Sequence, residues 1–133
     1  MSLGDAELPA LLATLTPICE RAYPREACGW IADGVRAARP GTRDGFGFGD
    51  DELIALTRSD ARALFHSHPD GDAELSARDR EALALHPRPH LIVAVAGGRA
   101  HAATLFGWRD GAHVPIARFV RTRDGGPARW SPA

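Results

Sequence analysis

Apolar residues recur at helical spacing near the start of this chain and form short continuous runs farther on. Between residues 5 and 22 the apolar positions fall three or four apart, which predicts an amphipathic helix that packs on a core. Pro9 suits the first turn of this helix, whereas Pro17 should kink or interrupt its last part. A short apolar run at 27–32 follows and predicts a strand.

Turn signals divide the middle of the chain. Asp33-Gly34 predicts a hairpin that pairs residues 35–38 back onto the strand before them. Residues 39–49 are rich in Pro, Gly and Arg and predict a mobile loop, in which Phe46 and Phe48 stand between glycines. In a peptidase such a loop can border the substrate groove, so both phenylalanines are candidate substrate contacts; the alternative is that they pack onto the domain.

The second half of the chain predicts three strands in succession. An unbroken apolar run at 91–96 is typical of a strand buried on both faces. Two further strands, 100–108 and 114–120, are separated by the hairpin signal Asp110-Gly111. The tail from about residue 121 is expected to be flexible. This order predicts a single α/β (α+β) domain, in which helices flank a mixed sheet.

Two histidines alternate at the end of another predicted strand. A short helix over 50–56 leads into apolar residues 61–65, which run into His66-Ser67-His68. Residues two apart in an extended chain point the same way, so His66 and His68 share one face. Two imidazoles presented together suit a first-row metal ion, but they need a third protein ligand.

The segment after these histidines can supply that ligand. Pro69 ends the extended run, and Asp70-Gly71-Asp72 provides turn residues that reverse the chain. Ser76 precedes good helix formers and is the predicted N-cap, with Asp79 at N3. A Ser-x-x-Asp alone is usually only a helix cap. Here the preceding turn folds the helix back onto the end of the strand, so Asp79 can complete a His-His-carboxylate set. Three protein ligands plus water is the arrangement of catalytic zinc.

Composition narrows the class of protein. The 133 residues carry a net charge of −1 with dispersed charges, so no nucleic-acid surface is expected. No apolar run approaches the length of a membrane span and no signal peptide is evident, so a soluble cytoplasmic protein is the expectation. Nothing in the sequence indicates an oligomeric state.

The remaining cysteines and histidines carry weaker signals. Cys19 and Cys28 do not make a disulfide framework. Cys28 lies beside Glu26 and could be a nucleophile, yet a small buried thiol is the favoured interpretation. Four histidines lack ligand spacing and are assigned to the surface or to the surroundings of the site: His86, His90, His101 and His113.

The motif around these ligands resembles the signature of the JAMM metalloprotease family, also called the MPN-plus or JAB domain. The resemblance rests on His66-Ser67-His68-Pro69, the spacing of seven residues between His68 and Ser76, and then Asp79. Upstream, the segment 24–29 around Glu26 looks like the family's glutamate segment. The resemblance spans most of the chain and implies a curved mixed sheet similar to that of cytidine deaminases.

The resemblance also implies a role for each residue of the motif. His66, His68 and Asp79 would bind one Zn²⁺ per chain. Glu26 would be the general base for a zinc-activated water, and Ser76 would hydrogen-bond the oxyanion. Zinc lowers the pKa of bound water to about 7, and a positioned base typically contributes about 10²–10⁴-fold in rate.

The implied function is a zinc metallo(iso)peptidase that cuts after the C-terminus of a ubiquitin-like or sulfur-carrier protein. Residues 71–76 leave little room for the insertions with which eukaryotic relatives grip a second ubiquitin. Two alternatives stay open, a noncatalytic MPN-type scaffold and a phage-tail-associated peptidase. A deaminase on a related fold is disfavoured because the sequence lacks a Pro-Cys-x-x-Cys pair.

Overall fold

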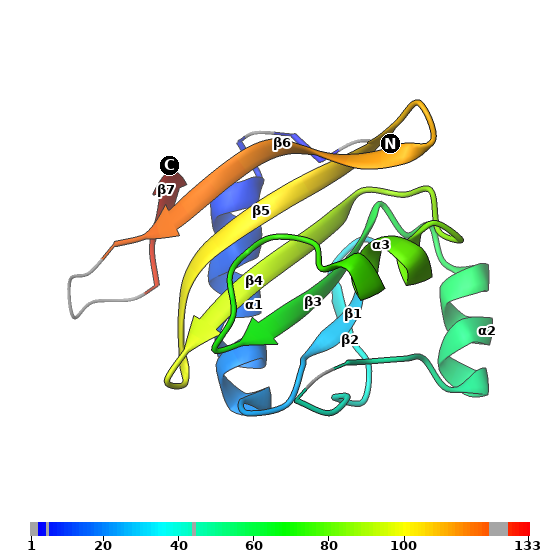
Figure 1. Ribbon diagram of the computed structural model, residues 1–133, viewed down its shortest axis with the longest axis horizontal. Coiled ribbons are helices and arrows are strands. Elements are labelled where there is room, and N and C mark those ends of the chain that lie inside the picture. Colours follow the sequence, from blue (N-terminus) through cyan, green and yellow to red (C-terminus); the bar gives the residue numbers. More distant parts are fainter. Residues whose placement is uncertain (1–2, 5, 44, 123–127) are drawn as a thin grey trace.

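The described strands form one mixed sheet in the order β2-β1-β3-β4-β5-β6-β7, with helices on both faces (Figure 1). This computed structural model describes residues 3–4, 6–43, 45–122 and 128–133. In chain order the elements are α1 (Leu8–Ala22), β1 (Cys28–Ile31), β2 (Val35–Ala37), α2 (Asp50–Arg58), β3 (Ala63–Pro69), α3 (Ala77–Leu83), β4 (His90–Ala96), β5 (Arg99–Arg109), β6 (Ala112–Arg121) and β7 (Trp130–Pro132). The pair β3 and β4 is parallel and the other pairs are antiparallel. The predicted α+β domain is thereby confirmed.

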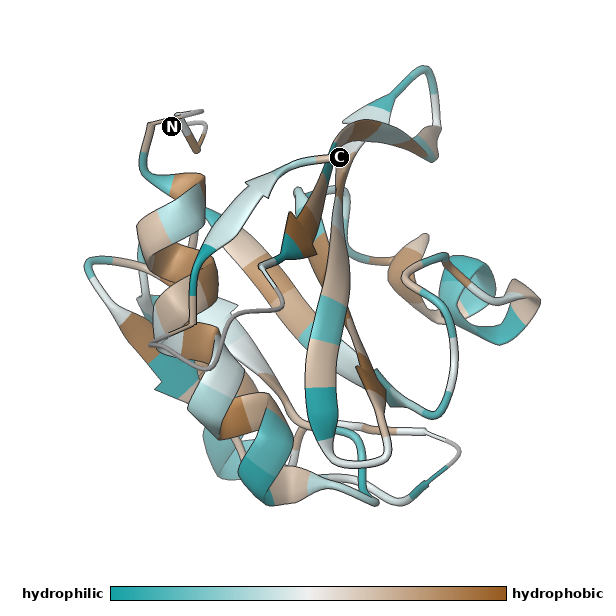
Figure 2. Cartoon of the chain, turned by 90° about the vertical axis from the view of Figure 1, so that its left-hand side faces the viewer, coloured by the Kyte–Doolittle hydropathy of each residue, from teal (hydrophilic) through white to brown (hydrophobic). Residues whose placement is uncertain are grey.

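Helix α1 covers one face of the sheet with its apolar stripe. Leu8, Leu12, Leu15 and Cys19 are buried in one cluster with side chains of the central strands. Figure 2 shows hydrophobic residues along this helix and on the strands beside it. The helix runs on through Pro17, so the predicted interruption is wrong. Packing of the turns on both sides of the proline explains this, because burial outweighs one missing backbone hydrogen bond.

The opposite face of the sheet is covered by α2 and α3. Leu56 of α2 and Leu83 of α3 join a second buried cluster with Leu64, Ile92 and Phe106 of the sheet. Side chains alternate between the faces of a strand, so even-numbered residues of β3 and β4 point to this second face. His66 and His68 therefore lie on the side of the sheet that carries α3.

Strand β4 lies at the centre of the sheet and is buried from His90 to Val95, as the unbroken apolar run predicts. The turns that flank β5 use residues with positive φ, at Gly97, Gly98, Asp110 and Gly111. The last two confirm the predicted hairpin, since such turns need φ > 0 at both central positions. The sheet thus ends in a meander.

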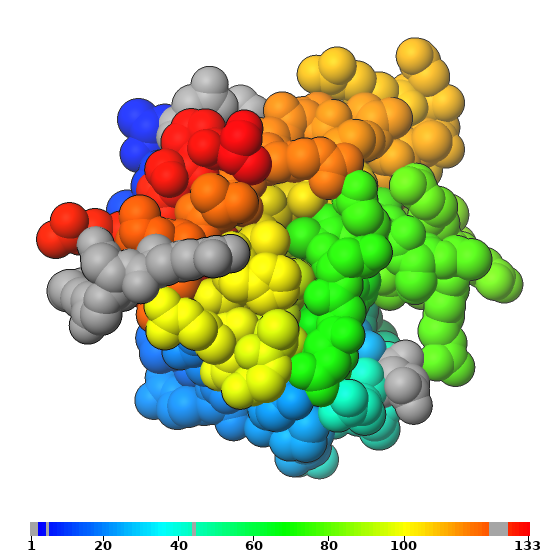
Figure 3. Space-filling model, turned by 60° about the vertical axis from the view of Figure 1, so that its left-hand side comes forward, coloured from blue at the N-terminus to red at the C-terminus, as the bar shows by residue number. Residues whose placement is uncertain are grey.

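The turn after β3 is pinned against the β4–β5 turn. Asp70, at φ 56°, donates its N–H to Val95 O at 2.6 Å and accepts Gly97 N–H at 2.9 Å. Figure 3 shows the segment after β3, in green, beside the β4–β5 turn, in yellow. The Gly97 N–H, the Tyr23 hydroxyl at 2.6 Å and Arg43 at 2.7 Å all donate to the Asp70 carboxylate and hold its pKa down at about 2. This turn fixes the direction in which the chain leaves His68.

Helix α3 is shorter than the sequence pattern predicts. It ends at Leu83, whereas the helix formers and the prolines at 87 and 89 place its end near residue 86. His86 N–H closes a turn onto Leu83 O at 2.9 Å. A residue before proline disfavours helical dihedrals, so the two prolines unwind the preceding turn.

The end of the chain differs from the predicted flexible tail. Residues 123–127 lie outside the described part of the chain, but Trp130–Pro132 form β7, which pairs with β6. The indole of Trp130 is buried against α1, and its Nε1–H donates to Thr16 Oγ1 at 3.0 Å. A flexible end was predicted because Gly, Pro and Arg dominate the tail, yet one buried aromatic anchors the last strand.

Trp130→Ala should therefore lower the free energy of unfolding by about 3–5 kcal/mol, as large-to-small changes at buried aromatics do. Urea unfolding followed by circular dichroism measures this change. Ser131→Ala is the matched control, because its side chain is exposed on the same strand. A loss below about 1 kcal/mol for Trp130→Ala would show that β7 contributes little to the fold.

Candidate metal centre

Strand β3 presents both histidines from the middle of the sheet. His66 lies between Cys28 on β1 and Ile92 on β4, and it is fully buried. The two imidazole Nε2 atoms, of His66 and His68, are 2.9 Å apart. Alternation along an extended strand brings the two rings together, as the sequence predicts.

Glu26 reaches the histidines through the register of β1 and β3. These strands pair antiparallel with Cys28 opposite His66, and Ser67 N–H continues the pairing to Ala27 O at 2.9 Å. The Glu26 carboxylate therefore comes beside the rings, with Oε1 3.9 Å from His66 Nε2. Its backbone is fixed by two hydrogen bonds of 2.8 Å, to Thr42 O and from Gly41 N–H. Glu26 is buried at the mouth of β1.

Asp79 is positioned by the cap of α3. Ser76 is the N-cap, and its Oγ accepts the Asp79 N–H at 3.0 Å. In return Asp79 Oδ2 accepts the Ser76 N–H at 3.1 Å. The same oxygen lies 2.9 Å from His68 Nε2 and 3.3 Å from His66 Nε2. The predicted cap thus also aims the carboxylate at the rings.

The hydrogen bonds of His68 decide which of its nitrogens can bind a cation. Its Nδ1 lies 2.8 Å from the carbonyl oxygen of Asp72. A carbonyl only accepts, so Nδ1 carries the proton and, in the neutral ring, Nε2 keeps a lone pair. This lone pair faces His66 Nε2 and Asp79 Oδ2, so a proton or a cation must lie among them to offset the repulsion.

The donor set fits a metal ion. Ligand atoms of Glu26, His66 and His68 lie within 4.8 Å of one another, and this group could bind one metal ion. Asp79 adds a second carboxylate to the same group. Imidazole nitrogen and carboxylate oxygen are ligands that zinc and other first-row metals accept.

Burial and hydrogen bonding set the protonation states of the site. Complete burial lowers the pKa of His66, because the charged ring would be desolvated. Burial opposes ionisation of Asp79, but its close contacts with the His66 and His68 rings hold its pKa well below the usual range. Burial also disfavours the charged form of His68, but the Asp79 carboxylate outweighs this and raises the pKa of that ring. A neutral imidazole and an ionised carboxylate are the forms that bind metals.

Ser76 is exposed at the start of α3, three residues before Asp79. Its hydroxyl accepts the Asp79 N–H and keeps its own proton to donate. The structure therefore places a hydroxyl donor at the same helix end as the carboxylate.

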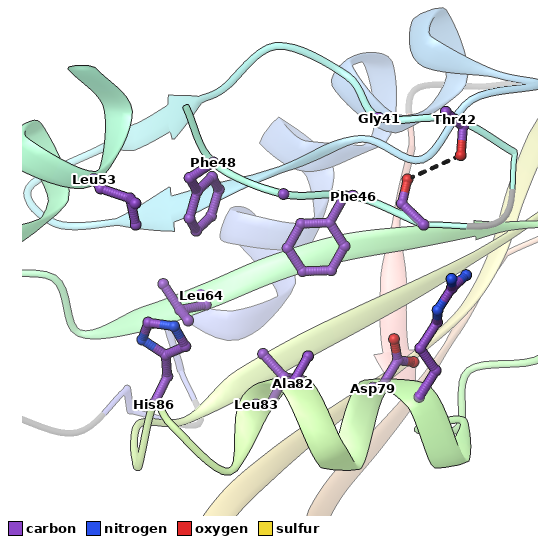
Figure 4. Close-up of a pocket in the computed structure, with 13 residues that line it drawn as sticks. Gly41, Thr42, Phe46, Phe48, Leu53, Leu64, Asp79, Ala82, Leu83 and His86 are labelled. Atoms are coloured by element: carbon purple, nitrogen blue, oxygen red, sulfur yellow. Dashed lines mark hydrogen bonds between the residues drawn. The ribbon is translucent and has the colours of Figure 1, made fainter. Parts of the chain in front are cut away.

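The loop that carries Phe46 and Phe48 lies across from α3 and borders a groove of about 580 Å³. Figure 4 shows the two phenylalanines on one side and Ala82 and Leu83 of α3 on the other, with Asp79 at one end. The Phe46 ring also stacks on the His66 ring, with centroids 4.5 Å apart. An apolar groove therefore leads to the candidate metal centre.

Cys28 has no features of a nucleophile. Burial raises the pKa of its thiol to about 12, and Sγ lies 3.5 Å from Arg39 O. The thiolate is the reactive form, so a raised pKa disfavours a nucleophilic role for this cysteine. The favoured interpretation, a buried structural thiol, is confirmed.

The sequence assigned His90 either to the surface or to the surroundings of the site, without a specific role. The structure buries it completely, with Nε2 2.7 Å from His66 Nδ1. The sequence signal for this burial was the position of His90 directly before the apolar run at 91–96. His113 is not at the surface, because it is buried and its Nε2 lies 2.9 Å from Arg88 O. His86 borders the groove and His101 is exposed.

Comparison with known proteins finds similarity among solved structures. No family model matches the chain, and no curated protein matches it. Among solved structures it is similar to the solution structure of protein DSY2949 from Desulfitobacterium hafniense, with 20% sequence identity and a TM-score of 0.45. The likeness covers 93% of this chain and 86% of the other. Separately, no helix in the described residues has the length and apolar character to span a bilayer.

Proposed function

We propose that this protein is a zinc-dependent metallo(iso)peptidase of the JAMM type, with the cytidine-deaminase-like JAB fold. One observation carries the proposal, the convergence of two imidazoles and one carboxylate with a second carboxylate beside them. His66 Nε2, His68 Nε2 and Asp79 Oδ2 are 2.9 to 3.3 Å apart, and Glu26 Oε1 is 3.9 Å from His66 Nε2.

The spacing of these atoms favours Asp79 as the third ligand and Glu26 as the base. A tetrahedral zinc with bonds of about 2.0–2.1 Å has ligand atoms about 3.3 Å apart. The Asp79 distances lie at or just below this spacing, while Glu26 Oε1 lies 3.9 Å from His66 Nε2, beyond it. In this proposal a water would lie between the Glu26 carboxylate and the ion. When bound, zinc would lower the pKa of a water to about 7 and polarise the scissile carbonyl.

The chain's own residues would then complete the hydrolysis. Glu26 takes a proton from the attacking water and passes it to the amine nitrogen as the C–N bond breaks. Ser76 donates its hydroxyl proton in a hydrogen bond to the carbonyl oxygen as negative charge develops there. His66, His68 and Asp79 would hold the ion in place. This division of roles agrees with the JAMM-like motif of the sequence.

The groove beside the centre suggests the class of substrate. It is apolar along Phe46, Phe48 and Leu53 and reaches Asp79 at one end, which suits an extended peptide whose scissile bond lies at the ion. We propose that the peptide is the C-terminus of a ubiquitin-like or sulfur-carrier protein, joined to an amine or an amino acid. The chain would act in the cytoplasm on this protein substrate.

Leu53 and its neighbour Ile54 offer a matched test of the groove. Leu53 borders it and Ile54 does not, although both side chains are exposed on α2. Leu53→Ala should raise KM by roughly three- to tenfold with kcat nearly unchanged, because part of an apolar contact is lost. Ile54→Ala should leave both constants unchanged. Equal effects of the two substitutions would remove the groove from substrate binding.

The activity is tested with fusions in which a ubiquitin-like domain ending in Gly-Gly is joined to a peptide or to a lysine side chain. Zinc-loaded protein should release the free C-terminus, and a chelator should stop the release. Mass spectrometry identifies the cut bond. Failure of fully zinc-loaded protein to cut any fusion, with retained binding to the domain, would favour a noncatalytic scaffold.

A further inference from the structure

His90 lies behind the candidate metal centre, on the side of His66 away from the other ligands. It opens β4, where it pairs with Leu64 of β3 and Phe106 of β5. Its side chain is completely buried and points to the same face of the sheet as His66. Its Nε2 lies 2.7 Å from His66 Nδ1, so the two rings share one hydrogen.

The position of that hydrogen decides whether His66 can bind a metal. If His66 Nδ1 carries it and donates to His90 Nε2, the Nε2 of neutral His66 has a free lone pair. If His90 donates instead, the Nε2 of neutral His66 must carry a proton and cannot bind an ion. Only the first arrangement directs a lone pair at Asp79 Oδ2 and His68 Nε2, the atoms that lie 3.3 and 2.9 Å away.

A second observation indicates that His90 is not there for packing. Its other nitrogen, Nδ1, is buried and has no hydrogen-bond partner among the described residues. An unsatisfied buried polar atom costs folding stability, and a leucine would fill a similar volume without that cost. The neighbours in the second cluster are apolar, among them Ile92 and Phe106. A histidine at this position is therefore explained by its one hydrogen bond to His66.

We propose that His90 is a positioning residue of the metal centre, which accepts the His66 Nδ1–H and so keeps His66 Nε2 as the metal-binding nitrogen. The role rests on the proposed metal centre, and it assigns a function to a residue outside the ligand set. Partners of this kind orient a ligand ring and raise its basicity, and their loss typically weakens metal affinity about 10- to 100-fold.

The test measures zinc affinity by competition with a chromophoric chelator, and needs no turnover. His90→Leu should bind zinc about 10- to 100-fold more weakly than wild type. His90→Gln should bind it nearly as well, because the glutamine side-chain oxygen can accept the His66 proton. His113→Leu is the control, since it removes another buried histidine, which bonds Arg88 O. It should leave zinc affinity unchanged.

Nitrogen-15 NMR of zinc-loaded wild type reads the tautomer directly, with the proton of His66 expected on Nδ1. Urea unfolding of His90→Leu should show a cooperative transition like that of wild type, which excludes misfolding as the cause of weaker binding. Its stability should change little, because leucine removes the unpaired Nδ1 of His90 but leaves His66 Nδ1 without a partner.

The outcomes separate this role from the proposed function. Equal zinc affinity in wild type and His90→Leu overturns the positioning role and leaves the metal centre intact. Weak binding by both His90→Leu and His90→Gln reassigns His90 to packing. Absence of zinc binding by wild type overturns both proposals together.

Discussion

Asp79→Ala is expected to lose zinc and turnover together. The carboxylate is the ionised group nearest to both rings, with Oδ2 2.9 Å from His68 Nε2 and 3.3 Å from His66 Nε2. Two imidazoles alone leave a tetrahedral ion half bound. Elemental analysis should give about one zinc per chain for wild type and a small fraction of that for the variant.

The control for this substitution is Asp72→Ala, which removes a carboxylate from the same segment but keeps the backbone carbonyl that accepts from His68. Zinc content should stay at the wild-type level. Asp79→Ala also removes half of the capping box, which costs about 1 kcal/mol, so its folding is checked by thermal unfolding. Full zinc occupancy in a folded Asp79→Ala would refute the ligand assignment.

Glu26→Gln is expected to keep zinc and lose turnover by about 10²- to 10⁴-fold, the usual contribution of a general base. The amide has the size of the carboxylate but cannot take a proton from water. In the proposed arrangement His66, His68 and Asp79 are the ligands, and Glu26 Oε1 lies farther out, 3.9 Å from His66 Nε2, so zinc should be retained. Single-turnover cleavage and zinc analysis on one preparation separate the two effects.

Glu81→Gln, on the exposed surface of α3, is the matched control and should match wild type in both measurements. Undiminished turnover of Glu26→Gln would remove Glu26 from the mechanism. If Glu26→Gln lost zinc and Asp79→Ala retained it, the roles of ligand and general base would be exchanged between Glu26 and Asp79. The ligand set would then be the Glu26, His66 and His68 group.

The local features of this protein follow from the sequence alone. Alternation in an extended chain places His66 and His68 on one face, and the Ser76–Asp79 cap forms within a single turn of helix. The hairpin at Asp110-Gly111 and the burial of β4 follow for the same reason. Each depends only on neighbours in the chain or on the run of apolar residues.

Other features were decided by the tertiary structure. Glu26 reaches the rings because β1 pairs with β3 in one register, and a shift of one residue would turn its side chain to the other face. His90 contacts His66 because β4 lies parallel to β3, and Trp130 anchors the tail on α1. These contacts join residues far apart in sequence, so they depend on how the whole chain minimises exposed apolar surface, which no local pattern encodes.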